Sequence, residues 1–88
     1  MKLVRKLTVK SAMGLHTRPA TAIVKLLQNC SSNVFFTYKN DTINAKSILG
    51  ILMLAAKKNT KITVSVEGDD AETTMEKLVL AFDDGFGV

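Results

Sequence analysis

The sequence predicts an α/β (α+β) fold of order βαββαβα, an open-faced two-layer sandwich in which helices cover one side of a single sheet. Four segments alternate apolar and polar residues, which is typical of strands with one buried face. Three other segments carry apolar residues at helical spacing along one face. The 88 residues suit one domain that spans residues 1–88.

The first strand and the first helix occupy the N-terminal third of the chain. Leu3–Val9 alternates, although Arg5 falls on the otherwise apolar face. A loop follows, and the helix is expected from about His16 to Gln28, before a polar cluster around Cys30. Its apolar stripe has the spacing i, i+3, i+4, i+7 and comprises Ala20, Ile23, Val24 and Leu27.

A hairpin is expected in the middle of the chain. Val34–Tyr38 is a β-branched and aromatic run, and Thr42–Ala45 returns beside it. Between them, Lys39-Asn40-Asp41 has the residue types of a turn.

The second helix is expected over Ile48–Ala56, with Ser47 as its N-cap and Lys57-Lys58 complementing the dipole at its C-terminus. Almost every residue in this segment is apolar. A helix that lies on a sheet buries one side only, so part of the set Ile48, Leu49, Leu52 and Met53 should face water. An exposed apolar patch usually marks a surface for a partner.

The last strand and helix close the domain. Ile62–Val66 alternates most clearly, and Gly68-Asp69-Asp70 ends the strand and caps the third helix. Residues 83–88 are expected to form a frayed tail. The buried face of the third helix is expected to comprise Ala71, Met75, Leu78, Val79 and Phe82.

Composition excludes several classes of protein. The net charge of +4 favours acidic partners, but there is no Trp and no basic cluster interleaved with aromatic residues, which argues against nucleic acid. Cys30 is the sole cysteine, so no internal disulfide forms, which suits a cytoplasmic location. No apolar run reaches the length of about 18 residues that a membrane span needs, and no signal peptide is recognisable.

The stretch Gly14-Leu15-His16-Thr17-Arg18-Pro19-Ala20 contains the only histidine and the only proline of the chain. Proline fits the first turn of a helix, where amides lack partners. His16 and Arg18 should therefore lie at a helix N-terminus, where free amides and the dipole attract anions. An imidazole nucleophile, a guanidinium and free amides together indicate uptake of a phosphoryl group.

Each of these residues also has a plainer interpretation. His16 could be a surface or capping histidine, Arg18 a solvated cation, Ser47 a simple cap and Cys30 a packing residue. One histidine and one cysteine without paired acidic residues do not make a metal site, and no Ser or Cys triad is recognisable. No metal and no cofactor are expected.

The motif resembles the active-site signature of the HPr family, the histidine-containing phosphocarriers of the bacterial phosphoenolpyruvate-dependent sugar phosphotransferase system. Lys46-Ser47-Ile48-Leu49-Gly50 is similar to the regulatory serine segment of that family. The resemblance covers essentially the whole chain and implies a four-stranded antiparallel sheet of order 1-4-2-3 backed by three helices. Met13 departs from the family pattern, because many relatives have a polar residue there.

The resemblance also implies a role for each residue. His16 would accept a phosphoryl group on Nδ1 from phosphorylated enzyme I and donate it to the IIA component of a sugar permease, with Arg18 stabilising the group. Ser47 would be the target of HPr kinase/phosphorylase in bacteria that have it. Such a protein is a monomeric carrier rather than an enzyme. The expected partner-binding residues are Thr17, Thr21, Ile48, Leu49 and Leu52.

A second hypothesis is a mainly regulatory HPr-like or nitrogen-branch module, switched by phosphorylation of Ser47 or His16. The presence of His16 argues against regulation as the sole role. A small basic nucleic-acid binder is a third hypothesis, which predicts steeply salt-dependent binding.

Overall fold

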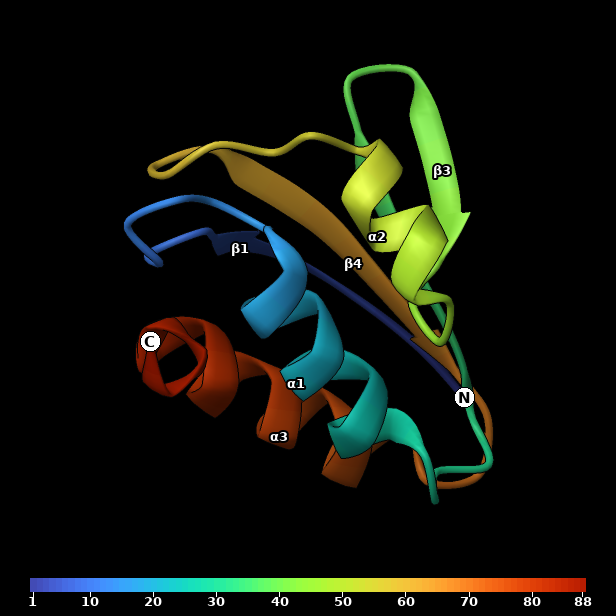
Figure 1. The fold of residues 1–88 in the computed structure, drawn as a ribbon. Coiled ribbons are helices and arrows are strands. Elements are labelled where there is room, and N and C mark those ends of the chain that lie inside the picture. Colours follow the sequence, from blue (N-terminus) through green and yellow to red (C-terminus); the bar gives the residue numbers. More distant parts are fainter.

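The computed structural model describes residues 1–88 and has the predicted element order (Figure 1). The strands are β1 (Lys2–Thr8), β2 (Asn33–Tyr38), β3 (Asp41–Asn44) and β4 (Lys61–Glu67). The helices are α1 (Thr17–Leu27), α2 (Ile48–Met53) and α3 (Ala71–Asp83), followed by a 3₁₀ turn at Gly85–Gly87.

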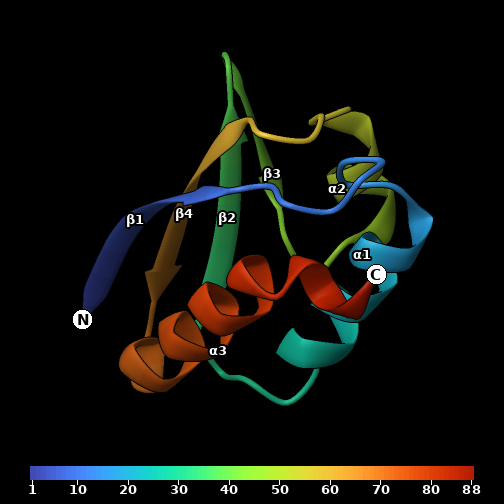
Figure 2. The same ribbon diagram turned by 90° about the vertical axis from the view of Figure 1, so that its left-hand side faces the viewer.

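The four strands form one antiparallel sheet of order β1-β4-β2-β3, as expected. All three helices lie on the same side of it, so the other face of the sheet is open to solvent (Figures 1 and 2). α3 packs against β1 and β4, α2 packs against β3, and α1 lies between α2 and α3. This arrangement confirms the two-layer sandwich.

The core lies between the sheet and the helices, and it follows from the alternation of the strands. On β4, Ile62, Val64 and Val66 are fully buried, whereas the residues between them are partly exposed. Phe36 of β2 meets Phe82 of α3 edge to face, with ring centroids 5.7 Å apart, a favourable geometry for aromatic pairs. The helices add further fully buried side chains, namely Ile23, Leu27, Ile51 and Leu78.

α2 is shorter than the sequence predicts, because it ends at Met53 rather than at Ala56. Leu54 is the C-cap, and Ala55 has a positive φ of 52°, a conformation that ends a helix. The backbone oxygen of Ala56 accepts a hydrogen bond from Leu15 N at 2.9 Å, outside any helical ladder. Lys57-Lys58 therefore does not lie in the last turn of α2, and the predicted dipole interaction was wrong.

The C-terminal segment is ordered by packing, so the predicted frayed tail was also wrong. Gly85 and Phe86 both adopt positive φ, near 60°, which turns the chain back on itself. The Phe86 ring then packs against Phe82, with centroids 4.8 Å apart. This aromatic contact ties the 3₁₀ turn to α3.

Asp70 is the N-cap residue of α3, but its side chain does not cap that helix. Its carboxylate instead accepts hydrogen bonds from Ser31 N at 2.8 Å, from Ser32 N at 3.0 Å and from the Ser32 hydroxyl. These bonds hold the pKa of Asp70 well below its usual range, at about 2, because they favour the ionised form. The carboxylate therefore links the α1–β2 loop to the start of α3.

Candidate functional site

The loop before α1 is held rigidly in place, and it determines where His16 lies. Gly14 has a φ of +72°, and a Cβ at this position would lie 2.2 Å from the Ala56 backbone oxygen. The buried Ser11 hydroxyl donates to Gly14 O at 2.7 Å, and Leu15 N donates to Ala56 O. Only glycine fits this close approach, so Gly14 lets the loop pack directly against the backbone of Ala56.

His16 is the N-cap residue of α1, and its backbone is extended, with φ −84° and ψ −167°. Its carbonyl accepts the first helical hydrogen bond, from Ala20 N at 3.0 Å. Its imidazole makes no hydrogen bond to the protein and is partly exposed. Pro19 lies buried in the first turn, as expected, and anchors the start of α1 to the core, while the ring of His16 has no hydrogen-bond partner in the protein.

Arg18 and the amides of the first turn make the N-terminus of α1 electropositive. The first four amides of a helix have no partner within it, and Pro19 contributes none, so the donors that remain are those of His16, Thr17 and Arg18. The first turn contains no acidic residue, and Lys10–Asp83 is the only ion pair of the structure. The Arg18 guanidinium is therefore unpaired and available to an anion.

A shallow cleft of about 400 Å³ runs beside Arg18, between α1 and the C-terminal turn. Lys25 lies on the same face of α1, seven residues after Arg18, and adds a second exposed cation. The sequence prediction missed Lys25 and Phe86 as parts of this region. The helical spacing of Arg18, Thr21 and Lys25 was a usable signal, whereas Phe86 was hidden by its place in an apparent tail.

The two threonines assigned to partner binding lie on this face. Thr17 is exposed and Thr21 is half-buried. The Thr21 hydroxyl donates to Thr17 O at 2.8 Å, which leaves its lone pairs free for a partner.

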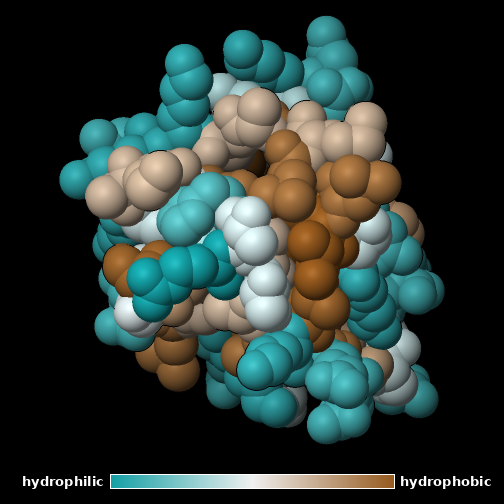
Figure 3. Space-filling view, in the orientation of Figure 1, coloured by the Kyte–Doolittle hydropathy of each residue, from teal (hydrophilic) through white to brown (hydrophobic).

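α2 presents the exposed apolar patch that its sequence predicts (Figure 3). Leu49 and Met53 are 68% and 71% exposed and Ile48 is 39% exposed, while Ile51 is fully buried. Leu52 is half-buried at the margin of the patch. Four residues form this surface, the α2 patch: Ile48, Leu49, Leu52 and Met53.

Met13 is a further exposed apolar residue, and it lies in the loop that precedes His16. Its side chain is 77% exposed. The residue after it, Gly14, packs against the backbone of Ala56 and Lys57, which follow α2. The Met13 loop and the end of α2 are therefore direct neighbours.

Ser47 lies at the far end of α2 from His16. Its hydroxyl caps the helix by accepting from Gly50 N at 3.1 Å, as predicted, and it is exposed. Lys46 Nζ donates to Cys30 O at 3.1 Å, which places the start of α2 beside the end of α1. The His16 loop contacts the other end of α2, so the structure does not bring Ser47 and His16 together.

Other chemistry has no counterpart in the structure. No group of three or more His, Cys, Asp or Glu residues is arranged to hold a metal ion. None of the helices has both the length and the apolar character needed to span a membrane. Cys30 is half-buried against the core and its thiol donates weakly to Ser32 O at 3.6 Å, in keeping with a packing role.

The comparisons with known proteins agree with this geometry. A family model described as "PTS HPr component phosphorylation site" matches residues 3–84. The phosphocarrier protein HPr of Chlamydia muridarum is 43% identical over 79 residues, which are 90% of this chain and 76% of that protein. The crystal structure of HPr-C-His from Thermoanaerobacter tengcongensis is 34% identical, with a TM-score of 0.92 over 98% of this chain and 97% of that chain.

A third similar structure is that of Crh, a catabolite repression protein of Bacillus subtilis described as a dimer with a swapped domain. It is 32% identical, with a TM-score of 0.77 over 92% of this chain and 93% of that chain. The family thus includes members named for regulation as well as phosphocarriers. With a family model that spans residues 3–84, this chain belongs to the HPr family of the phosphotransferase system, in which the relatives named HPr are phosphocarrier proteins and not enzymes.

Proposed function

We propose that this protein accepts a phosphoryl group on His16 from phosphorylated enzyme I and donates it to IIA components of sugar permeases. The observation that carries the proposal is the free imidazole of His16 at the N-cap of α1, with the unpaired Arg18 two residues later. An exposed acceptor is what a carrier needs, because the same nitrogen must meet two different partners.

The transfer itself needs little from the carrier beyond position and charge. The lone pair of His16 Nδ1 attacks phosphorus, the P–N bond to the donor histidine breaks, and the ring proton stays on Nε2. The amides of the first turn and the guanidinium of Arg18 stabilise the phosphoryl oxygens. The second transfer runs the same steps in reverse, with His16 as the leaving group.

Docking is proposed to use the α2 patch together with Thr17 and Thr21 of α1. The patch supplies apolar area, and the cations Arg18 and Lys25 favour acidic surfaces on enzyme I and IIA. The protein is proposed to act as a cytoplasmic monomer, since each encounter must leave the surface open for the next partner.

Regulation is proposed to act at Ser47, through phosphorylation by HPr kinase/phosphorylase. The hydroxyl caps α2 and is exposed, so a kinase can reach it after the bond to Gly50 N is broken. A phosphate here would lie next to Ile48 and Leu49 and would place about two negative charges beside the apolar patch. It would therefore weaken docking without touching His16.

A second candidate function is a mainly regulatory module, or a nitrogen-branch carrier, whose output is the phosphorylation state of Ser47 or His16. The similarity to Crh favours this candidate. If Ser47 alone is the switch, only a serine kinase should label the chain, and His16→Ala should leave the regulatory interaction unchanged. If His16 is the switch, His16→Ala should abolish that interaction.

The test is incubation with enzyme I and labelled phosphoenolpyruvate. One acid-labile, base-stable phosphate per chain is expected, and it should be absent in His16→Ala. In Arg18→Ala the uptake rate should fall about 100-fold, as for the loss of one charge-stabilising donor. Lys77→Ala, which removes an exposed charge on α3, should behave like the wild type. Label that persists in His16→Ala would contradict the proposal.

A further inference from the structure

β1 forms one edge of the sheet, and its outer side is not paired with any strand. Gly68 N donates to Met1 O and Val9 N donates to Thr60 O, both across the ladder to β4. Because bonded pairs alternate in an antiparallel ladder, the odd-numbered residues of β1 pair with β4. The backbone groups of Lys2, Val4, Lys6 and Thr8 therefore point to the free edge.

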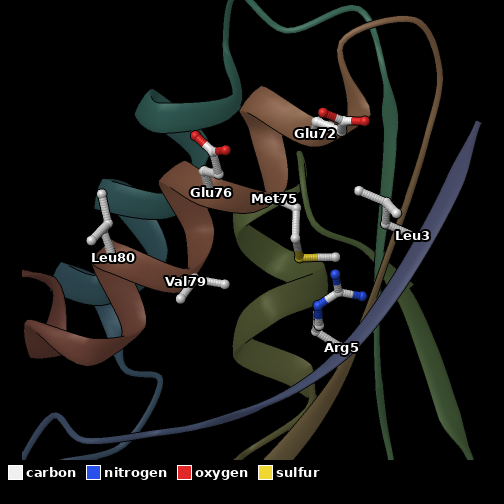
Figure 4. A pocket seen from close by; sticks show the side chains of 7 residues that line it. All are labelled: Leu3, Arg5, Glu72, Met75, Glu76, Val79 and Leu80. Carbon is white, nitrogen blue, oxygen red and sulfur yellow. The ribbon is translucent and has the colours of Figure 1, made fainter.

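Free edges of sheets are templates for pairing with further strands. Beneath this edge, between β1 and α3, lies a cleft of about 600 Å³ that is lined by four apolar side chains and by the charged side chains of Arg5, Glu72 and Glu76 (Figure 4). Its apolar side chains are those of Leu3, Met75, Val79 and Leu80, and Leu80 is 69% exposed. The edge and the cleft together offer an incoming strand both backbone partners and apolar contact.

Arg5 lies on the inner face of β1, where the sequence pattern calls for an apolar residue. It lies directly opposite the buried Val64 of β4, and residues paired in this way share a face. Its side chain extends into the cleft below Met75 (Figure 4). Glu72 and Glu76 line the same cleft, yet neither forms an ion pair with Arg5.

The guanidinium instead turns to the edge, where Arg5 Nη1 donates to Val4 O at 3.0 Å. The Val4 carbonyl is one of the hydrogen-bond acceptors that a further strand would need in order to pair with β1. An added strand would displace this bond. It would also enclose the guanidinium in the cleft together with two carboxylates, none of which forms an ion pair in the structure, and burial of unpaired charges costs free energy.

We propose that Arg5 closes the edge of β1 against a second copy of this chain. With Arg5→Val, the inner row becomes apolar from Leu3 to Leu7 and the Val4 carbonyl is freed. Two copies of β1 can then pair antiparallel about Val4, extending the sheet and covering the cleft. In that arrangement Lys2 of one copy faces Lys6 of the other, so the dimer should tighten as salt screens this repulsion.

The test is the molar mass of the full-length chain by size-exclusion chromatography with light scattering, over a range of concentration and salt. Wild type is expected to remain monomeric. Arg5→Val is expected to dimerise with a dissociation constant at least about tenfold lower than wild type, and more tightly at higher salt. Thr8→Val, which makes an outer position of the same strand apolar and leaves Arg5 and the Lys2–Lys6 repulsion in place, is the matched control and should stay monomeric.

Hydrogen exchange identifies the interface. In the Arg5→Val dimer the amides of Val4 and Lys6 should exchange more slowly than in wild type, because they become paired. A monomeric Arg5→Val, a dimeric wild type, equal association of Thr8→Val, or protection elsewhere would each overturn the proposal.

Folding is followed by circular dichroism, and Arg5→Thr serves as a second variant that keeps a strand-forming polar residue. If Arg5→Val fails to fold, dimerisation of Arg5→Thr still supports the proposal. If both variants fail to fold, Arg5 is required for folding and its role is not to block pairing at the β1 edge. That result would overturn the proposal. The experiment measures molar mass and amide hydrogen exchange, so its result does not depend on phosphoryl transfer to His16.

Discussion

Gly14 is the residue that fixes the distance between the His16 backbone and the rest of the domain. Its Cα lies so close to the Ala56 carbonyl that no side chain fits, and its φ is positive. Leu15, the next residue, is bonded to the same carbonyl. The geometry of the acceptor site thus depends on a contact between segments about forty positions apart in sequence.

Gly14→Ala should therefore lower the free energy of unfolding by about 3 kcal/mol and slow phosphoryl uptake, because the loop must move. Chemical denaturation and the enzyme I assay measure the two effects. Gly87→Ala is the matched control: its φ is +73°, but a Cβ there meets no atom within 4 Å. It should cost only about 1 kcal/mol and leave uptake unchanged. Equal effects of the two substitutions would contradict this assignment.

Asp70 should make stability depend on pH in the acid range. Its pKa is lowered to about 2 by hydrogen bonds from Ser32 and Ser31. A carboxyl with a lowered pKa in the folded state stabilises the fold above its unfolded pKa, near 4, and loses this contribution as the pH falls to about 2. Asp70→Asn should therefore lower the melting temperature at neutral pH, and the difference from wild type should disappear between pH 4 and pH 2.

Asp69→Asn is the control for this titration, because the exposed Asp69 side chain makes no hydrogen bond. At neutral pH its melting temperature should stay close to that of wild type. A difference between Asp70→Asn and wild type that persists at pH 2 would show that the carboxylate contributes by packing and not by its charge.

At the scale of elements, α2 exposes the apolar side chains that we propose as the docking surface. Leu49→Glu should raise the KM for transfer from enzyme I by about tenfold or more, because it places a charge in the centre of the α2 patch. Leu80→Glu is the matched control, since Leu80 on α3 is 69% exposed and Leu49 is 68% exposed. The KM of Leu80→Glu should not change. If both substitutions raise KM equally, the α2 patch is not the docking surface.

The C-terminal turn is the second element with a testable role. Phe86→Ala removes the edge-to-face contact with Phe82 and should lower the free energy of unfolding by about 2 kcal/mol. It also removes one wall of the cleft beside Arg18. Thermal denaturation measures the loss, and an unchanged melting temperature would mean that the turn is not packed in solution.

Sequence patterns predicted the elements whose structure depends on local periodicity. The alternation in β4 corresponds to the residues buried in the structure, and so does the helical stripe of α1 except at Val24, which is only partly buried. The end of α2 was not predictable in this way, because the hydrogen bond from Leu15 N to Ala56 O and the positive φ of Ala55 depend on distant packing. The same reason applies to Phe86, whose aromatic contact is absent from any local pattern.

For the molecule as a whole, one sheet face carries the core, and the proposed phosphorylation sites lie at the starts of α1 and α2. The position of His16 and Arg18 at a helix start followed from one proline and the apolar spacing after it. The position of Ser47 relative to His16 did not follow from the sequence, because only the packing of α1 on α2 shows that the serine lies at the end of α2 away from the His16 loop. Phosphorylation at Ser47 should therefore alter binding of partners more than the chemistry at His16.

The central claim is that His16 carries the phosphoryl group between two proteins, and a single-turnover chase tests it most directly. The chain is labelled with enzyme I and phosphoenolpyruvate, purified, and mixed with an unlabelled IIA component. A carrier predicts that the label leaves this chain and appears on IIA with equal stoichiometry. Label that remains on the chain, or that is released only as inorganic phosphate, would contradict the claim.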